Sequence, residues 1–138
     1  MTVVPIVTFA LAQALGAPAQ GPALVSPRPF SARYDLDSET GVITRLGHPL
    51  YGRPIAGTIL VCPAVQGGVA AGWMLMKLAA RGVGFAGLAF GRINPVMVQG
   101  AQAAGIAIGA GLSPDAFQQL HTDDLVRLDP QARRLMLL

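Results

Sequence analysis

Residues 37–72, DSETGVITRLGHPLYGRPIAGTILVCPAVQGGVAAG, contain a turn, two strands, a histidine loop and a glycine-rich helix entrance in one continuous stretch. In the turn 37–41, Gly41 is free to take a positive φ where a strand begins. Residues 58–62 form a β-branched apolar run of strand length. Gly67 and Gly68 follow, and then an apolar stretch of helix length, so these glycines are predicted to join a strand to a helix N-terminus. Such a terminus offers unpaired N–H groups and the positive end of a dipole, which favour a carboxylate or phosphate.

Along the whole chain, the sequence predicts mainly strands in the first half and alternating helices and strands in the second. Turns rich in Gly and Pro separate the early strands, and the later helices carry cap signals, such as Asn94 followed by Pro95. Strands are predicted around 3–9, 23–25, 41–46, 55–62, 85–90, 106–108, 125–128 and 135–138, and helices over 69–81, 95–104 and 113–120. This order predicts an α/β fold, a swivelling β/β/α domain whose strand-rich first half is followed by alternating helices and strands.

Composition limits the organisation and the partners of the chain. Its 138 residues fit one domain spanning 1–138 with its own core. Charged residues make up only 12%, about half the usual share, so part of the surface is expected to meet a partner. The net charge is +3 and the arginines are dispersed. Nucleic-acid binding is not expected, because it would require a basic stripe with stacking aromatic residues.

Cysteine content and the N-terminal segment indicate the compartment. Cys62 is the only cysteine, which excludes an internal disulfide and suits a reducing compartment. It is expected to be a small buried residue, and alone it could not hold an iron–sulfur cluster. Residues 3–15 are apolar, yet no Lys or Arg precedes them and the run is too short to cross a bilayer. We therefore expect a strand or a partner-covered segment, a cytoplasmic location and no membrane association.

Several short motifs occur in an order and spacing shared with a known family. They are the strand entry APAQGPALV at 17–25, the turn DSETG at 37–41, the loop GHPLYG at 47–52, the segment RINPV at 92–96, and Gly100. Together they resemble the small subunit, or swivelling domain, of the aconitase X family from about Ala17 onward. The resemblance implies the swivelling fold and a working partnership with a large subunit.

The same resemblance implies a chemistry. Members of the family are hydro-lyases that dehydrate small hydroxylated carboxylic acids, such as cis-3-hydroxy-L-proline or a mevalonate phosphate. The large subunit would carry the iron–sulfur cluster as Lewis acid for the leaving hydroxyl. This chain would hold no metal or cofactor itself, would close one wall of a cleft at the subunit boundary, and would supply contacts to the substrate anion.

Two positions depart from the family pattern. The loop after the 58–62 strand is usually rich in serine, and one of those serines is the family's proton acceptor, but residues 66–72 read QGGVAAG without a hydroxyl. A Gly-Gly pair expected just before the 37–41 turn is replaced by Tyr34 and Asp35. Proton abstraction needs a group within hydrogen-bond reach, so the resemblance predicts the fold and the partnership more directly than the chemistry.

Few side chains remain for catalysis. His48 is the catalytic candidate, because an imidazole has a suitable ordinary pKa; alternatively it hydrogen-bonds its own loop and the partner supplies the base. Near it in sequence, Gln66, Gly67 and Gly68 are candidates to bind a substrate carboxylate through backbone amides and one side-chain amide. The alternative for this loop is a tight strand-to-helix turn.

The remaining candidates are charged or apolar surface residues. Arg33 and Arg92 could pair bidentately with a substrate carboxylate, or they are solvated surface charges. His121 is expected to cap the third helix or to meet the acidic pair 123–124, and no metal site is predicted. Trp73, with Met74 and Met76, is expected in the core or at a subunit interface.

Two rival functions are compatible with parts of the sequence. One is a non-catalytic binding or regulatory module of the same fold that has lost the catalytic serine, and the serine-free loop favours it. The other is a phosphohistidine-carrying swivelling domain. That function needs a histidine directly after the glycine-rich loop, and the sequence has none there.

Overall fold

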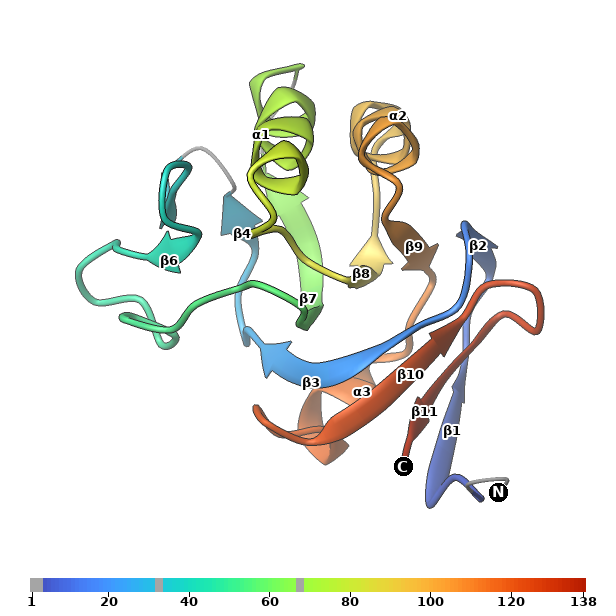
Figure 1. The fold of residues 1–138 in the computed structure, drawn as a ribbon. Coiled ribbons are helices and arrows are strands. Elements are labelled where there is room, and N and C mark those ends of the chain that lie inside the picture. The colour runs from blue at the N-terminus through green and yellow to red at the C-terminus, as the bar shows by residue number, and fades with distance from the viewer. Residues whose placement is uncertain (1–3, 32–33, 67–68) are drawn as a thin grey trace.

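The computed structural model describes residues 4–31, 34–66 and 69–138 (Figure 1). Within these ranges the strands are β1 (Val7–Ala10), β2 (Gln13–Leu15), β3 (Ala19–Val25), β4 (Phe30–Ser31), β5 (Leu36–Asp37), β6 (Val42–Ile43), β7 (Ile59–Gln66), β8 (Gly87–Arg92), β9 (Ala107–Ala110), β10 (Leu125–Asp129) and β11 (Arg134–Leu137). The helices are α1 (Val69–Ala80), α2 (Pro95–Ala104) and α3 (Pro114–Gln119).

Among the described residues, nine strands form one sheet in the order β1-β11-β10-β3-β7-β8-β9-β2, with β4 also paired to β7. Strands β3, β7, β8 and β9 run parallel, whereas β10, β11 and β1 are antiparallel to their neighbours. The first four residues of β7 are buried, as expected for a parallel strand covered on both faces. The sequence ILVC supplies this apolar run.

The parallel strands lie between two layers. Figure 1 shows α1 and α2 on one side of them and the ribbon of β10, β11 and β1 on the other. One apolar cluster joins Leu75, Leu78 and Met97 of the helices to Leu60 and Leu88 of the strands. A second cluster joins the other face of the parallel strands to β1, β10, β11 and α3. These layers confirm the predicted swivelling β/β/α fold.

The cap signals position the helices as predicted. The side chain of Asn94 accepts a hydrogen bond from the Met97 N–H at 2.9 Å, and Pro95 occupies the first helical position of α2. Gly105 ends this helix at φ 73°, in the left-handed region. The predicted helix over 69–81 is observed as α1, and Gly82 follows it with φ 72°.

Strand boundaries differ from the predictions at several places. The 55–62 strand begins only at Ile59, because Thr58 N–H donates to Ile55 O in a turn that includes Gly57 at φ 72°. It runs past Pro63 to Gln66, where β4 pairs with its end. The 41–46 strand is reduced to β6, and the 3–9 strand begins at Val7.

Three short strands, β2, β4 and β5, were not predicted. The pairing of β2 with β9 nevertheless confirms strand structure in the N-terminal segment. Cys62 is buried, as expected. None of the helices in the described ranges is long and apolar enough to cross a membrane.

Candidate functional site

A polar pocket of about 200 Å³ lies beside the carboxyl end of β7. Its lining residues are Arg28, Pro29, Asp35, Arg45 and Gln66. The pocket exists because β4 pairs in parallel with the last residues of β7, Phe30 opposite Val65 and Ser31 opposite Gln66. Ligands of open α/β sheets bind at the carboxyl ends of parallel strands, so this pocket occupies the edge at which a substrate is expected.

Asp35 is a buried carboxylate in the lining of this pocket. Its side chain is 3% exposed. Its Oδ2 accepts a hydrogen bond from the Ser31 N–H at 2.7 Å, and its Oδ1 accepts one from Arg45 Nη1 at 3.0 Å. The Asp35 carbonyl accepts from the N–H groups of Thr44 and Arg45. Asp35 therefore fixes the segment before the 37–41 turn to the segment after β6.

His48 lies behind Asp35, and its side chain is 1% exposed. Nδ1 accepts a hydrogen bond from the Leu50 N–H at 3.0 Å, so the neutral ring carries its proton on Nε2. Nε2 is 3.7 Å from Asp35 Oδ2, longer than a hydrogen bond, and has no hydrogen-bond partner among the described residues. Burial lowers the pKa of His48, the Asp35 charge raises it, and the charges of Arg28 and Arg45 lower it.

Aromatic packing and one arginine hold the histidine loop against β4. The rings of Phe30 and His48 meet edge to face, with centroids 5.8 Å apart. Arg28 Nη2 donates to Gly47 O at 3.2 Å. The alternative role of His48, a hydrogen bond within its own loop, is therefore present. The imidazole lies next to Asp35, the one carboxylate among the described residues that line the pocket.

The structure brings one predicted binding residue into this pocket. Gln66 ends β7, is exposed, and lines it. Arg92 ends the neighbouring strand β8, opposite Ala64, and is exposed but does not line the pocket. The predicted residues Arg33, Gly67 and Gly68 lie outside the described residues. Their flanking elements, β7 ending at Gln66 and α1 beginning at Val69, agree with the predicted strand-to-helix connection.

Sequence reasoning missed Arg28, Asp35 and Arg45. Arg28 and Arg45 are 17 positions apart, and the pocket depends on the two-residue strand β4, so no local pattern marks them. Asp35 did carry a signal, since it stands where the resemblance expected glycine. The turn 37–41 already has its own carboxylate, Asp37, so a second carboxylate just before it, at position 35, could have been recognised from the sequence as a candidate site residue.

Cys62 is a buried thiol that belongs to no cluster of potential metal ligands among the described residues. Burial raises the pKa of its thiol to about 12, and Sγ donates to Ala64 O at 3.2 Å. Only a thiolate binds metal well. In the part of the chain that the structure describes, no group of three or more His, Cys, Asp and Glu residues is placed to hold a metal ion.

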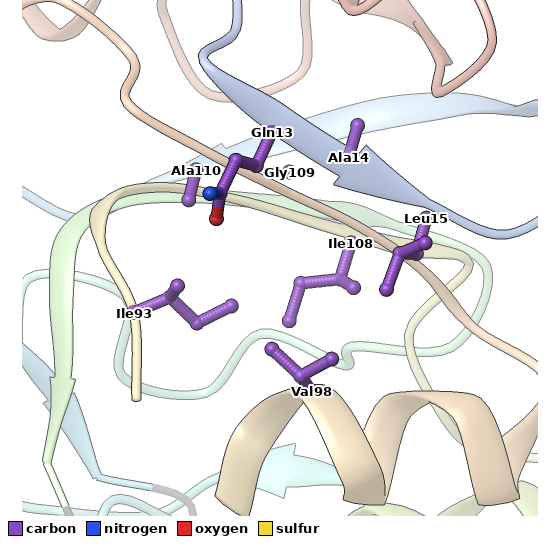
Figure 2. Close-up of a pocket in the computed structure, with 8 residues that line it drawn as sticks. All are labelled: Gln13, Ala14, Leu15, Ile93, Val98, Ile108, Gly109 and Ala110. Atoms are coloured by element: carbon purple, nitrogen blue, oxygen red, sulfur yellow. The ribbon is translucent and has the colours of Figure 1, made fainter. Parts of the chain in front are cut away.

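A second pocket is small and apolar. Its volume is about 100 Å³. Figure 2 shows Ile93, Val98, Ile108 and Leu15 around it, with the Gln13 amide as its polar side chain. It lies between β2, β9 and the start of α2. The described residues that line it include no charged group, so it is not a candidate for the chemistry.

The other predicted surface residues are placed as follows. The backbone N–H of His121 donates to Asp124 Oδ2 at 2.8 Å, which agrees with the expected contact to the acidic pair. Trp73 is 71% exposed and Met76 46%, so they are not core residues of this chain, whereas Met74 packs against the core. Trp73 and Met76 line a hollow of about 240 Å³ between α1 and α2.

Comparisons with known proteins agree with this fold. The chain is 31% identical over 117 residues to the phosphomevalonate dehydratase small subunit of Methanocella arvoryzae, covering 85% of this chain and 89% of that protein. It is 30% identical to the protein of that name from Methanopyrus kandleri, over 82% and 84% of the two chains. The crystal structure of Thermococcus kodakaraensis aconitase X in its holo form superposes with a TM-score of 0.86 at 26% identity, over 95% of this chain and 98% of that one.

The family match covers almost the whole sequence. The aconitase X swivel domain matches residues 9–137, which include all the strands from β3 onward, the three helices and the polar pocket. The resemblance stated from the sequence motifs is therefore confirmed, and the chain belongs to the aconitase X swivel domain family.

Proposed function

We propose that this chain is the small subunit of an aconitase-X-like hydro-lyase, which dehydrates a small hydroxylated carboxylic acid at a cleft shared with a large subunit. The observation that carries the proposal is the match to small subunits of named dehydratases over more than four fifths of each chain. The polar pocket at the carboxyl end of β7 supports it, because its charged lining suits an acidic substrate.

The names of the relatives set the order in which substrates should be tested. Two relatives are called phosphomevalonate dehydratase small subunits, so a mevalonate phosphate is the first substrate to test. cis-3-Hydroxy-L-proline is the second. Both are hydroxylated carboxylic acids, and only the first carries a phosphate.

The large subunit is the proposed carrier of an iron–sulfur cluster, which would supply Lewis-acid polarisation of the leaving hydroxyl when bound. The buried Cys62 thiol, with its raised pKa, is consistent with a cluster held elsewhere. We propose a cytoplasmic location, because a reducing compartment suits both the lone cysteine and such a cluster.

The proposed tasks of this chain are substrate binding and proton abstraction. Gln66, Gly67 and Gly68, with Arg33 and Arg92, remain the proposed contacts to the substrate carboxylate. His48 remains the proposed source of the base. Nε2 of the buried imidazole already carries the ring proton, and Nδ1 accepts a hydrogen bond from the Leu50 N–H. His48 would therefore take up a substrate proton only at Nδ1, after that loop hydrogen bond opens. The partner subunit is the alternative source of the base.

A second function is favoured by one feature of the sequence. The segment 66–72 has no hydroxyl, so the chain could be a binding or regulatory descendant of the enzyme that keeps the fold and the partnership. Both functions require a large subunit, and only the first requires turnover.

Reconstitution separates the two. The chain is co-expressed with an aconitase-X-type large subunit from the same genome and purified without oxygen. The complex is then assayed with a mevalonate phosphate and with cis-3-hydroxy-L-proline. Formation of the dehydrated product supports the enzyme. If the wild-type complex turns over neither substrate, while variants with serine at Gly68, Val69 or Ala70 do, the chain is a binding descendant. Failure to form any complex would contradict both functions.

A further inference from the structure

The pocket beside β7 carries an excess of positive charge. Among the described residues that line it, Arg28 and Arg45 contribute two guanidinium groups and Asp35 one carboxylate, which leaves one net positive charge. Gln66 adds an amide with two N–H donors. A small pocket with this lining suits a negatively charged ligand that accepts several hydrogen bonds.

The Asp35 charge is already matched by donors of its own chain. Both of its oxygens accept hydrogen bonds, one from Arg45 and one from the Ser31 N–H, and its side chain is 3% exposed. Asp35 therefore neutralises and orients Arg45 but leaves the charge of Arg28 unbalanced. A ligand in the pocket would meet the guanidinium groups more readily than this carboxylate.

Both guanidinium groups are held in place and keep donors for a ligand. A guanidinium has five N–H donors. The hydrogen bonds found for these two side chains in the described part of the chain use Nη2 of Arg28, to Gly47 O, and Nη1 of Arg45, to Asp35. These bonds restrict the two long side chains before any ligand binds, which lowers the entropy cost of binding.

We propose that Arg28, Arg45 and Gln66 form an oxyanion subsite, which binds the carboxylate or the phosphate of the substrate, with Asp35 positioning Arg45. The assignment of the ligand as substrate rests on the proposed function, whereas the affinity for an oxyanion does not. Arg28 and Arg45 come from segments before and after β4, and Gln66 is the one member of the subsite that also belongs to the predicted 66–68 loop.

The direct test is titration of the ¹⁵N-labelled full chain with inorganic phosphate, followed by NMR. We expect saturable shifts of the Arg28 Nε–H, the Gln66 side-chain amide and the Ser31 and Arg45 backbone amides, with a dissociation constant on the order of 1–10 mM, as for weak ion pairing at a surface. Titration with acetate at equal ionic strength decides between the two groups. Stronger binding of phosphate assigns the phosphate, and stronger binding of acetate assigns the carboxylate.

Three variants make the test specific. Arg28→Met should weaken phosphate binding by about tenfold or more, the usual loss for a hydrogen bond to a charged group. Arg45→Lys keeps the positive charge that faces Asp35 but loses the planar guanidinium with its several N–H donors. It should weaken phosphate binding less than Arg28→Met. Arg134→Met removes an exposed arginine of β11, a strand that β10 and β3 separate from β7 in the sheet, and should leave binding unchanged.

Two results would overturn the subsite. One is the absence of saturable shifts at these residues up to about 50 mM phosphate, in a chain whose spectrum is folded. The other is an equal loss of binding in Arg28→Met and Arg134→Met, which would indicate a general charge effect. If phosphate binds here but the reconstituted complex is inactive, the proposed function fails and the subsite stands. If the complex is active and the Michaelis constant is unchanged in Arg28→Met, the subsite fails alone.

Discussion

His48 is a buried imidazole whose two nitrogens face different groups, and this permits a test of its role. Nδ1 accepts from the Leu50 N–H, and Nε2 faces Asp35. Asparagine at position 48 can keep the first contact through Oδ1 and cannot act as a base. If His48 supplies the base, both His48→Ala and His48→Asn should lower turnover of the assembled complex on the order of 10²-fold.

The comparison of these variants separates catalysis from loop anchoring. A purely structural role predicts that His48→Asn restores turnover and that the Tm of His48→Ala falls. A base supplied by the partner predicts nearly unchanged turnover in both. His121→Ala, which removes an exposed imidazole, serves as the matched control.

The same residue makes stability depend on pH. Burial lowers the pKa of His48 in the folded chain below the ordinary value of 6.5. Between these two pKa values the unfolded chain binds a proton that the folded chain does not, so the free energy of unfolding falls as the pH drops through 6.5. Urea unfolding at pH 7.5 and pH 5.5 should therefore show a smaller loss of stability in His48→Asn than in the wild type. An equal or larger loss of stability in the variant would contradict the lowered pKa of His48.

At the scale of elements, the close approach of α1 and α2 depends on two glycines. A Cβ on Gly100 would lie 2.7 Å from Gly72 Cα and 3.1 Å from Gly72 O, and such backbone atoms can move only with the whole helix. Gly100→Ala should therefore destabilise the chain by about 1–3 kcal/mol, as overpacking does.

Whether Gly100→Ala lowers or raises the free energy of unfolding shows whether the two helices are held tightly together. Alanine is the better helix former by about 1 kcal/mol, so a stabilised variant would show that the helices separate easily. Gln102→Ala, at an exposed position of the same helix, should stay within about 0.5 kcal/mol of wild type. Thermal unfolding of both variants gives the comparison.

Elements with local signals were predictable, and elements made by tertiary pairing were not. Asn94, Pro95 and Gly105 marked both ends of α2, because caps act within one turn of the helix. The two-residue strand β4 has no such signal, since only its alignment with the end of β7 defines it. The polar pocket depends on that alignment. Gln66 was accordingly found from sequence, whereas Arg28, Asp35 and Arg45 were not.

At the scale of the whole molecule, the surface of α1 and α2 leads to the last prediction. The low charged fraction predicted a partner, and the structure shows Trp73 71% exposed beside Met76 on a hollow lined by both helices. Trp73 is the only tryptophan of the chain. It can therefore be labelled selectively with 5-fluorotryptophan and followed by ¹⁹F NMR after addition of the unlabelled large subunit.

We expect the single ¹⁹F signal of the free chain to shift between H₂O and D₂O, as for an exposed indole, and to lose that dependence in the complex. Aromatic residues at the centre of an interface contribute about 2 kcal/mol or more. Trp73→Ser should therefore weaken the complex about 30-fold or more, while Leu125→Ser, a change of an exposed apolar residue on β10, should not. If the fluorine signal stays exposed in a complex that forms, the partner binds another face, and the polar edge of β7 becomes the region where its contacts should be sought.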